Sequence, residues 1–267
     1  MHKPPVKPIF LSPHLDDAAL SCGGLIHQQA QQGIRPLVIT CFAGVPDYCV
    51  LSPFAAWQHQ RWGEVRDPVG LRRKEDAMAM ACLCAEYEHW DYLDCIYRCH
   101  PVTGEFFYTA EEALFGPIAS EELYLIDELV ARLKITLSIE STHLYAPLAV
   151  GQHVDHQIVF QVALQLRRLG FTMQYYEDYP YAEDSESLAS ALGSWLSPPS
   201  SFVLALSEED IEVKIAAIRH YRSQLAMLFG DEFAMAKRVK TRALAVGAGH
   251  GYGERYWQGG IKERRDA

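Results

Sequence analysis

The sequence lacks long apolar runs and clusters of positive charge. No stretch of about 18 apolar residues is present, so a membrane-spanning helix is not expected. Lysine and arginine form no basic run, and the formal net charge is −10. This charge disfavours binding to nucleic acid or to an anionic membrane surface. The N-terminus contains two adjacent prolines and no apolar segment typical of a secretory signal, so a cytoplasmic location is predicted.

The cysteines follow no disulfide or zinc-binding pattern. There are seven, an odd number, and the spacing Cys-x-x-Cys does not occur. Cys82 and Cys84 lie in an apolar, periodic stretch. Buried, reduced thiols are therefore expected, with a cysteine metal cluster as the alternative.

The composition is that of a folded globular protein, with 49% hydrophobic and 22% charged residues. A chain of 267 residues suits one large α/β domain or two small ones, and we predict one domain over residues 1–267. Residues 8–12 and 36–42 have the pattern of buried strands, and residues 18–32 have that of a helix. A strand, a helix and a second strand in this order predict a parallel βαβ unit.

Strands and helices alternate along the rest of the chain. Further strands are predicted at 90–93, 143–148, 171–176 and 202–206, and further helices at 71–85, 120–134, 153–169 and 207–228. Residues 44–70 are predicted to form a long aromatic loop, and residues 247–267 an irregular, glycine-rich tail. The predicted fold is α/β, with a Rossmann-like, mainly parallel sheet flanked by helices.

The first polar motif is Ser-Pro-His-Leu-Asp-Asp, in the turn between the first strand and the first helix. It contains His14, Asp16 and Asp17. An aspartate is a common helix cap, but three titratable groups in four residues exceed what a cap requires. The following helix contains Gly23 and Gly24, each costing roughly 1 kcal/mol relative to alanine. Either the close approach of another backbone or a local kink would explain them.

The second polar motif is His-Val-Asp-His, where His153 and His156 share one face of a helix start and Asp155 lies between them. A polar first turn is the structural alternative. In a parallel sheet, however, this turn and the first motif open at the same edge.

Together the two motifs offer His14, Asp17 and His156, a set of three ligands with open positions that is typical of a catalytic metal site. Asp16 and His153 remain beside it, as a carboxylate and an imidazole suited to acid–base work in hydrolysis.

These paired motifs resemble the N-acetylglucosaminyl-phosphatidylinositol de-N-acetylase (PIG-L) family and its bacterial LmbE-like deacetylases. Similar stretches extend the resemblance from residue 8 to residue 257: they are Arg72-Arg73-Lys74-Glu75, residues 175–181, Lys214, and Tyr221-Arg222-Ser223-Gln224. Leu15 and Ala18 depart from the family's usual His-Pro-Asp-Asp-Glu form. They replace neither a ligand nor the base, but they leave the substrate open.

The resemblance implies a zinc-dependent N-deacetylase acting on an N-acetylglucosamine-type sugar conjugate. It assigns His14, Asp17 and His156 as metal ligands, Asp16 as general base, His153 as the group that polarises the carbonyl or protonates the leaving amine, Asp155 as the residue that orients His153, and Arg72 as a substrate-binding residue. Residues 44–70 would then form the rim of the active site.

Several points stay open at this stage. Fe²⁺ or Mn²⁺ could replace Zn²⁺ in such a set. A homo-oligomer is compatible with the sequence but not indicated by it. The alternative functions are a metal-dependent amidase or esterase with a non-sugar acyl substrate, and a non-catalytic sugar-binding protein. A nucleotide-binding module is disfavoured, because the first turn lacks Gly-x-Gly-x-x-Gly.

Overall fold

The computed structural model describes residues 6–63, 66–193, 195 and 199–259. Its centre is one seven-stranded sheet with the strand order β3-β2-β1-β4-β5-β7-β6. The strands are β1 (Lys7–Ser12), β2 (Leu37–Thr40), β3 (Glu86–His89), β4 (Thr142–Pro147), β5 (Thr172–Tyr176), β6 (Ser200–Leu206) and β7 (Tyr252–Gln258). The pairs among β1 to β5 are parallel, and β7 runs antiparallel to both neighbours. The predicted fold class, a mainly parallel α/β sheet, is confirmed.

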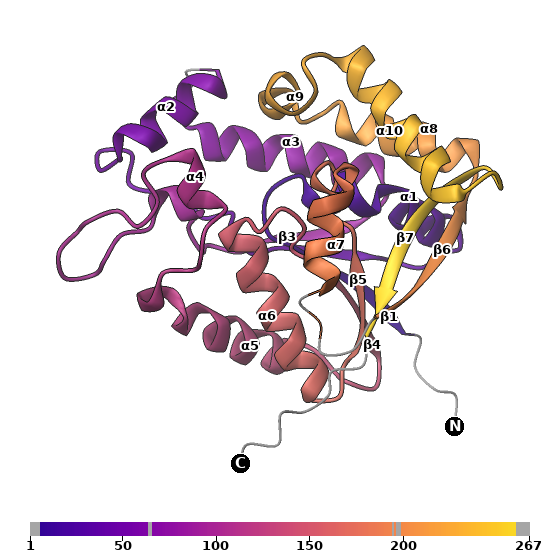
Figure 1. Ribbon diagram of the computed structural model, residues 1–267, viewed down its shortest axis with the longest axis horizontal. Coiled ribbons are helices and arrows are strands. Elements are labelled where there is room, and N and C mark those ends of the chain that lie inside the picture. The colour runs from indigo at the N-terminus through magenta and orange to yellow at the C-terminus, as the bar shows by residue number, and fades with distance from the viewer. Residues whose placement is uncertain (1–5, 64–65, 194, 196–198, 260–267) are drawn as a thin grey trace.

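Helices cover both faces of this sheet (Figure 1). They are α1 (Asp17–Gln31), α2 (Pro53–Arg61), α3 (Pro68–Cys82), α4 (Glu111–Leu114), α5 (Tyr124–Thr136), α6 (Val154–Arg168), α7 (Ser185–Gly193), α8 (Glu208–Ile218), α9 (Arg222–Phe229) and α10 (Glu232–Gly247). Short 3₁₀ turns occur at η1 (Cys95–Tyr97), η2 (Ser120–Glu122) and η3 (Tyr181–Glu183). Among the described residues, no helix combines the length and apolarity needed to cross a membrane.

The strands are apolar on both faces because each face carries its own core. Side chains alternate along β1, so that Ile9 and Leu11 pack with α5 and α6, whereas Phe10 packs with α1, α3 and α8. A further apolar cluster joins Leu20 of α1 to α8, α9 and α10. The sheet and the buried faces of α1 and α6 thus fix the ends of β1 and β4, where both polar motifs lie.

Several sequence predictions were wrong in detail. The third strand is β3 at Glu86–His89, not at 90–93, because this edge strand is largely solvent-exposed and polar. The helix expected over 207–228 consists of α8 and α9, which are separated at residues 219–221. All seven cysteines are free, as expected, but Cys49, Cys84 and Cys99 are exposed rather than buried.

Two segments expected to be irregular contain regular structure. Within residues 44–70, α2 begins after Ser52, whose side chain accepts a hydrogen bond from the Ala55 N–H, with Pro53 at the first helical position. Within residues 247–267, β7 fills the gap between β5 and β6 in the sheet. Residues 260–267 of the predicted tail lie outside the described residues.

Candidate active site

The two polar motifs meet at the carboxyl edge of the sheet. Asp17 is the first residue of α1 after β1, and His153 caps α6 after β4. Because β1 and β4 are adjacent and parallel, their following turns lie side by side. His14, Asp16, Asp17 and His153 line one open cavity of about 260 Å³. The expected juxtaposition of the two motifs is therefore confirmed.

The first turn is held by a tight network around a strained residue. The Ser12 hydroxyl donates to the His14 carbonyl at 2.8 Å and accepts from the Ala18 N–H at 3.1 Å. The His14 N–H donates to the Asp17 carboxylate at 2.8 Å. Asp16 has φ 156° and ψ −31°, a conformation that non-glycine residues rarely adopt. Such strain costs about 1–3 kcal/mol and often marks functional positions.

Asp17 lies between two of the expected metal-binding histidines. Its Oδ2 is 3.2 Å from His156 Nε2 and 3.5 Å from His14 Nδ1. Burial raises the pKa of the Asp17 carboxyl, but His156 and His14 outweigh burial and hold this pKa well below its usual value. An ionised carboxylate beside two imidazoles is a donor set that fits a divalent ion such as Zn²⁺.

Both of these histidines are oriented by a buried carboxylate on the opposite ring nitrogen. His14 Nε2 is 2.9 Å from Asp155 Oδ2, and His156 Nδ1 is 2.7 Å from Asp178 Oδ1. This leaves His14 Nδ1 and His156 Nε2 facing Asp17. A carboxylate behind a ligating histidine fixes its tautomer and raises its basicity, an arrangement common in metal sites.

The backbone and the side chain of Asp155 bind different histidines. Its N–H donates to His153, the histidine that Asp155 was predicted to orient, and that role stays a prediction. Its carboxylate contacts His14, the Arg98 guanidinium at 2.6 Å and the Cys95 N–H at 3.0 Å. Asp178 lies in the stretch 175–181 that carries part of the resemblance, but no role was predicted for it. It follows β5 at the same edge of the sheet, so the strand-end rule that located the other motifs would have found it.

His153 is bound differently from His14 and His156. Its Nδ1 accepts a hydrogen bond from the Asp155 backbone N–H at 3.3 Å, so the neutral ring carries its proton on Nε2. His14, His153 and His156 each have a ring nitrogen within 4.8 Å of those of the other two histidines. His153 is therefore close enough to be a ligand. The tautomer with the proton on Nε2 suits His153 to hydrogen-bond donation. Cys95 Sγ lies 3.9 Å from this nitrogen.

Asp16 and Arg72 share the wall of the cavity. Arg72 Nη2 is 3.7 Å from Asp16 Oδ2, and its guanidinium packs over the Trp62 ring at 4.8 Å. Burial raises the pKa of Asp16 to about 7, although Arg72 opposes the shift. The structure thus places Arg72 at the cavity, as expected of a substrate-binding residue, and also in contact range of Asp16.

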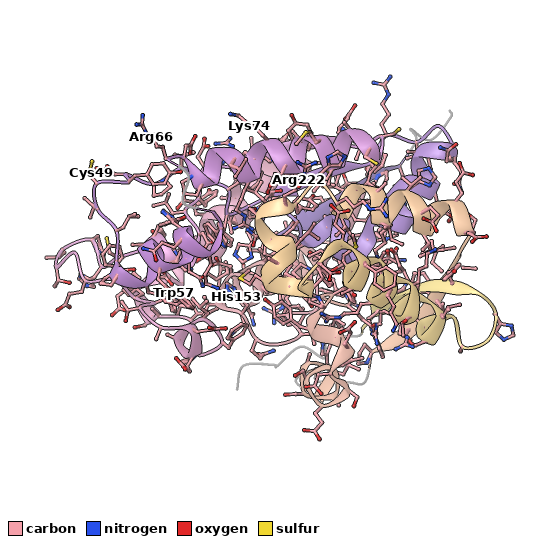
Figure 2. The ribbon with its side chains drawn as sticks, turned by 90° about the horizontal axis from the view of Figure 1, so that it is seen from above. Cys49, Trp57, Arg66, Lys74, His153 and Arg222 are labelled. Atoms are coloured by element: carbon pink, nitrogen blue, oxygen red, sulfur yellow. The ribbon has the colours of Figure 1, made fainter. Side chains whose placement is uncertain are left out.

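The outer walls come from elements far apart in sequence. Gln58, Arg61 and Trp62, from α2 and its end, line the cavity, as do residues of α4 and α9. Viewed from above, His153 lies between α2, which carries Trp57, and α9, which begins at Arg222 (Figure 2). Part of the segment 44–70 therefore lines the site as a helix instead of a loop.

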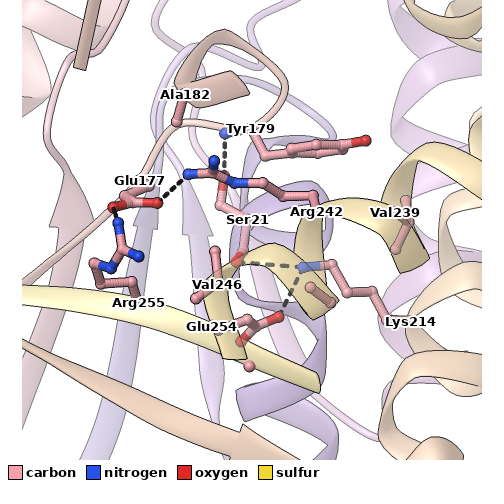
Figure 3. A pocket seen from close by; sticks show the side chains of 12 residues that line it. Ser21, Glu177, Tyr179, Ala182, Lys214, Val239, Arg242, Val246, Glu254 and Arg255 are labelled. Atoms are coloured by element: carbon pink, nitrogen blue, oxygen red, sulfur yellow. Dashed lines mark hydrogen bonds and ion pairs between the residues drawn. The ribbon is translucent and has the colours of Figure 1, made fainter. Parts of the chain in front are cut away.

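Behind the site, a buried ion pair is inserted against the middle of α1 (Figure 3). Lys214 Nζ donates to Glu254 at 2.7 Å and to the Ser21 carbonyl at 3.4 Å. Glu254 also accepts from the N–H groups of Gly24 and Leu25 at 2.9 and 3.0 Å. These contacts connect α8 and β7 to the helix that begins with Asp17.

The same contacts explain the two helical glycines. A Cβ on Gly23 would lie 2.9 Å from the Lys214 side chain, and one on Gly24 would lie 2.4 Å from Leu206 and 2.9 Å from Glu254. Close approach is therefore the reason for the glycines, but the approaching groups are side chains, not another backbone.

The chain is similar to known proteins over most of its length. The family described as "PIG-L: GlcNAc-PI de-N-acetylase" matches residues 9–167. The 2'-N-acetylparomamine deacetylase of Niallia circulans is 27% identical over 237 residues, covering 84% of this chain and 82% of that protein. The zinc-inhibited form of teicoplanin deacetylase Orf2 has a TM-score of 0.82 at 28% identity, covering 98% of this chain and all of that one. The A40926 pseudoaglycone deacetylase Dbv21 has a TM-score of 0.71 at 27% identity, covering 94% and 96%.

Proposed function

Because the chain belongs to the GlcNAc-PI de-N-acetylase (PIG-L) family, we propose that it is a metal-dependent hydrolase that removes the N-acetyl group from an N-acetylhexosamine-type sugar conjugate. The three relatives named above, one found by sequence and two by structure, are deacetylases, which confirms the predicted enzyme class. The single observation that carries the proposal is the convergence of Asp17 on two imidazoles that buried carboxylates hold from behind.

In this proposal His14, Asp17 and His156 hold the divalent ion. The ion supplies Lewis-acid assistance to amide hydrolysis. Zn²⁺ suits a set of two imidazoles and one carboxylate, and Fe²⁺ is an alternative with the same ligands. One relative has been described in a zinc-inhibited form. Because zinc inhibits that relative, Zn²⁺ should be tested here at both low and high concentration.

Asp16 and His153 carry the proton transfers. Asp16 is a buried carboxylate on the cavity wall that takes the proton of the attacking water, and Arg72 holds its position. The Nε2–H of His153 points away from the bond made by Nδ1 and donates either to the developing oxyanion or to the leaving amine. Each such group contributes typically 10²–10⁴-fold to the rate.

The test is acetate release from N-acetylglucosaminides by metal-loaded and chelated protein. We expect release that requires metal, and we expect Asp16→Asn to lower kcat by about 10²–10⁴-fold while retaining one metal per chain by elemental analysis. Asp91→Asn is the matched control, because that side chain is 82% exposed and lies outside the cavity lining.

Two outcomes would contradict the proposal at different points. Full turnover by Asp16→Asn would remove Asp16 as the base but leave the activity standing. Stoichiometric metal without acetate release from any N-acetyl sugar would contradict the deacetylase and favour the rival amidase or esterase, which release of other acyl groups from simple amides and esters would reveal.

A further inference from the structure

Apolar side chains from two elements far apart in the sequence line the active-site cavity. Leu114 and Phe115 lie at the end of α4, and Met227 and Leu228 lie on α9; all four line the cavity. Phe115 and Met227 remain 38% and 37% exposed. Large apolar side chains that face one open cavity are typical of a ligand-binding wall. We call these four residues the apolar mouth.

The apolar mouth begins directly beside the proposed catalytic histidine. The Phe115 ring meets the His153 ring edge-on with centroids 5.6 Å apart, and it meets Tyr181 at 6.0 Å. A group that binds at the apolar mouth can therefore belong to the same molecule as a sugar whose acetamide lies at His153. The occupant that fits is the aglycone of the same substrate.

The charges of the cavity disfavour a cationic aglycone. Four carboxylates line it, and each has a partner. Asp16 faces Arg72, and Glu111 faces Arg61 at 3.9 Å. Asp94 Oδ2 is 3.7 Å from His14 Nε2, and Asp17 lies between His14 and His156. Among the described residues, each lining carboxylate thus faces a guanidinium or an imidazole. Two guanidiniums and a doubly charged ion would balance the four negative charges.

We propose, resting on the deacetylase function above, that the substrate is an N-acetylhexosamine conjugate with an apolar, alkyl or aromatic aglycone, and that this aglycone binds between Leu114–Phe115 and Met227–Leu228. Each methylene buried there raises the binding constant about 3- to 4-fold. The gain continues until the mouth is filled, and it is realised in kcat/KM.

The experiment measures kcat/KM for a series of N-acetylglucosaminides with methyl, butyl, hexyl and phenyl aglycones, below micelle-forming concentrations. A conjugate with a polycationic aminocyclitol aglycone completes the series. For the wild-type enzyme we expect kcat/KM to rise by about 3- to 4-fold per methylene and to be lowest for the cationic conjugate. In Met227→Ser the ratio of hexyl to methyl kcat/KM should fall about tenfold or more, because the side chain loses three apolar heavy-atom positions.

Met78→Ser is the matched control, since Met78 is 48% exposed on α3 and lies outside the cavity lining. Its ratio should equal that of the wild type. A hexyl-to-methyl ratio near one in the wild type, or preference for the cationic conjugate, would overturn the apolar mouth and leave the deacetylase intact. If no conjugate releases acetate, the deacetylase proposal fails instead. Calorimetric titration of wild type and Met227→Ser with hexyl glucoside then tests aglycone binding at the apolar mouth independently of activity. Equal affinities of the two proteins for hexyl glucoside would contradict the proposed binding of the aglycone there.

Discussion

Asp178 is the residue on which the geometry of His156 depends. Its carboxylate contacts His156 Nδ1 at 2.7 Å and also accepts the Val150 N–H at 2.9 Å. The carboxylate therefore connects α6, the β4–α6 turn and the segment after β5. With Nδ1 occupied in this way, only Nε2 is free to face Asp17 and a metal.

We expect Asp178→Asn to weaken metal binding by about 10–100-fold, because a neutral amide is a poorer partner for the ring and no longer enforces one tautomer. Competition with a fluorescent chelator measures the affinity directly. Asp184→Asn, an exposed aspartate that caps the next helix, is the control. Equal metal affinity in wild type and Asp178→Asn would contradict the proposed orientation of His156.

The sequence predicts which residues gather at the site better than it predicts their partners. Spacing and strand ends brought His14, Asp17 and His156 together correctly, since these depend on topology alone. The direction of the Asp155 carboxylate depends on the path of the loop that contains Cys95 and Arg98, because both residues bind this carboxylate. That path has no periodic signal in the sequence.

At the scale of elements, α1 is positioned by side chains from two distant segments. Lys214 of α8 and Glu254 of β7 bind each other and the backbone of α1 at Ser21, Gly24 and Leu25. Both side chains are nearly buried. Removing one member leaves an unpaired charge in the interior, which costs far more than a surface ion pair contributes.

Glu254→Gln should therefore lower the free energy of unfolding by about 3–5 kcal/mol. Adding Lys214→Met to it should recover part of that loss, because the unpaired ammonium is removed. Urea unfolding measures both values. Lys240→Met, which breaks the exposed Lys240–Glu212 pair on the outer side of α8, should cost less than about 1 kcal/mol. Additive losses in the double variant would contradict the inferred coupling.

His143 makes the central strand β4 sensitive to pH. Its ring stacks on Tyr145 with centroids 4.8 Å apart, and burial lowers the pKa of His143 below its usual value. The unfolded chain therefore takes up a proton at a higher pH than the folded chain does. Stability that is present above the unfolded pKa is lost as the pH falls through it towards the folded pKa.

His143→Phe keeps a flat ring on Tyr145 and cannot be protonated. We expect the unfolding free energy of the wild type to fall relative to this variant when the pH is lowered from about 8 to about 5.5. Urea unfolding at the two pH values gives the difference. A constant difference between the two proteins would show that His143 titrates alike in the folded and unfolded chain.

Element prediction succeeded where burial imposes a period and failed where it does not. The strands at 8–12 and 143–148 were found because they are buried on both faces. β3 was misplaced because its exposed edge position allows a charged sequence. β7 was missed because Gly253 and the buried Glu254 interrupt its alternation of apolar and polar residues. The Glu254 carboxylate binds Lys214.

On the scale of the whole molecule, the site joins parts of the chain that share no local sequence. Asp17, His156 and Asp178 follow three adjacent strands of the sheet, β1, β4 and β5 respectively. A metal ion bound by His14, Asp17 and His156 would cross-link the turns after β1 and β4 in the folded state only. Metal binding should therefore report on global stability as well as on activity.

Chelation should lower the thermal midpoint of the whole chain. A ligand that binds only the folded state at about 100 times its Kd stabilises it by about 2.7 kcal/mol. For a chain of this size each kcal/mol shifts the midpoint by roughly 2–4 °C, so we expect a shift of roughly 5–10 °C between metal-saturated and chelated protein. Differential scanning calorimetry measures it, with His156→Ala as the control, because loss of one ligand should abolish most of the shift. If metal raised the midpoint of His156→Ala as much as that of the wild type, the stabilising ion would have to bind elsewhere, and the assignment of these three ligands would be wrong.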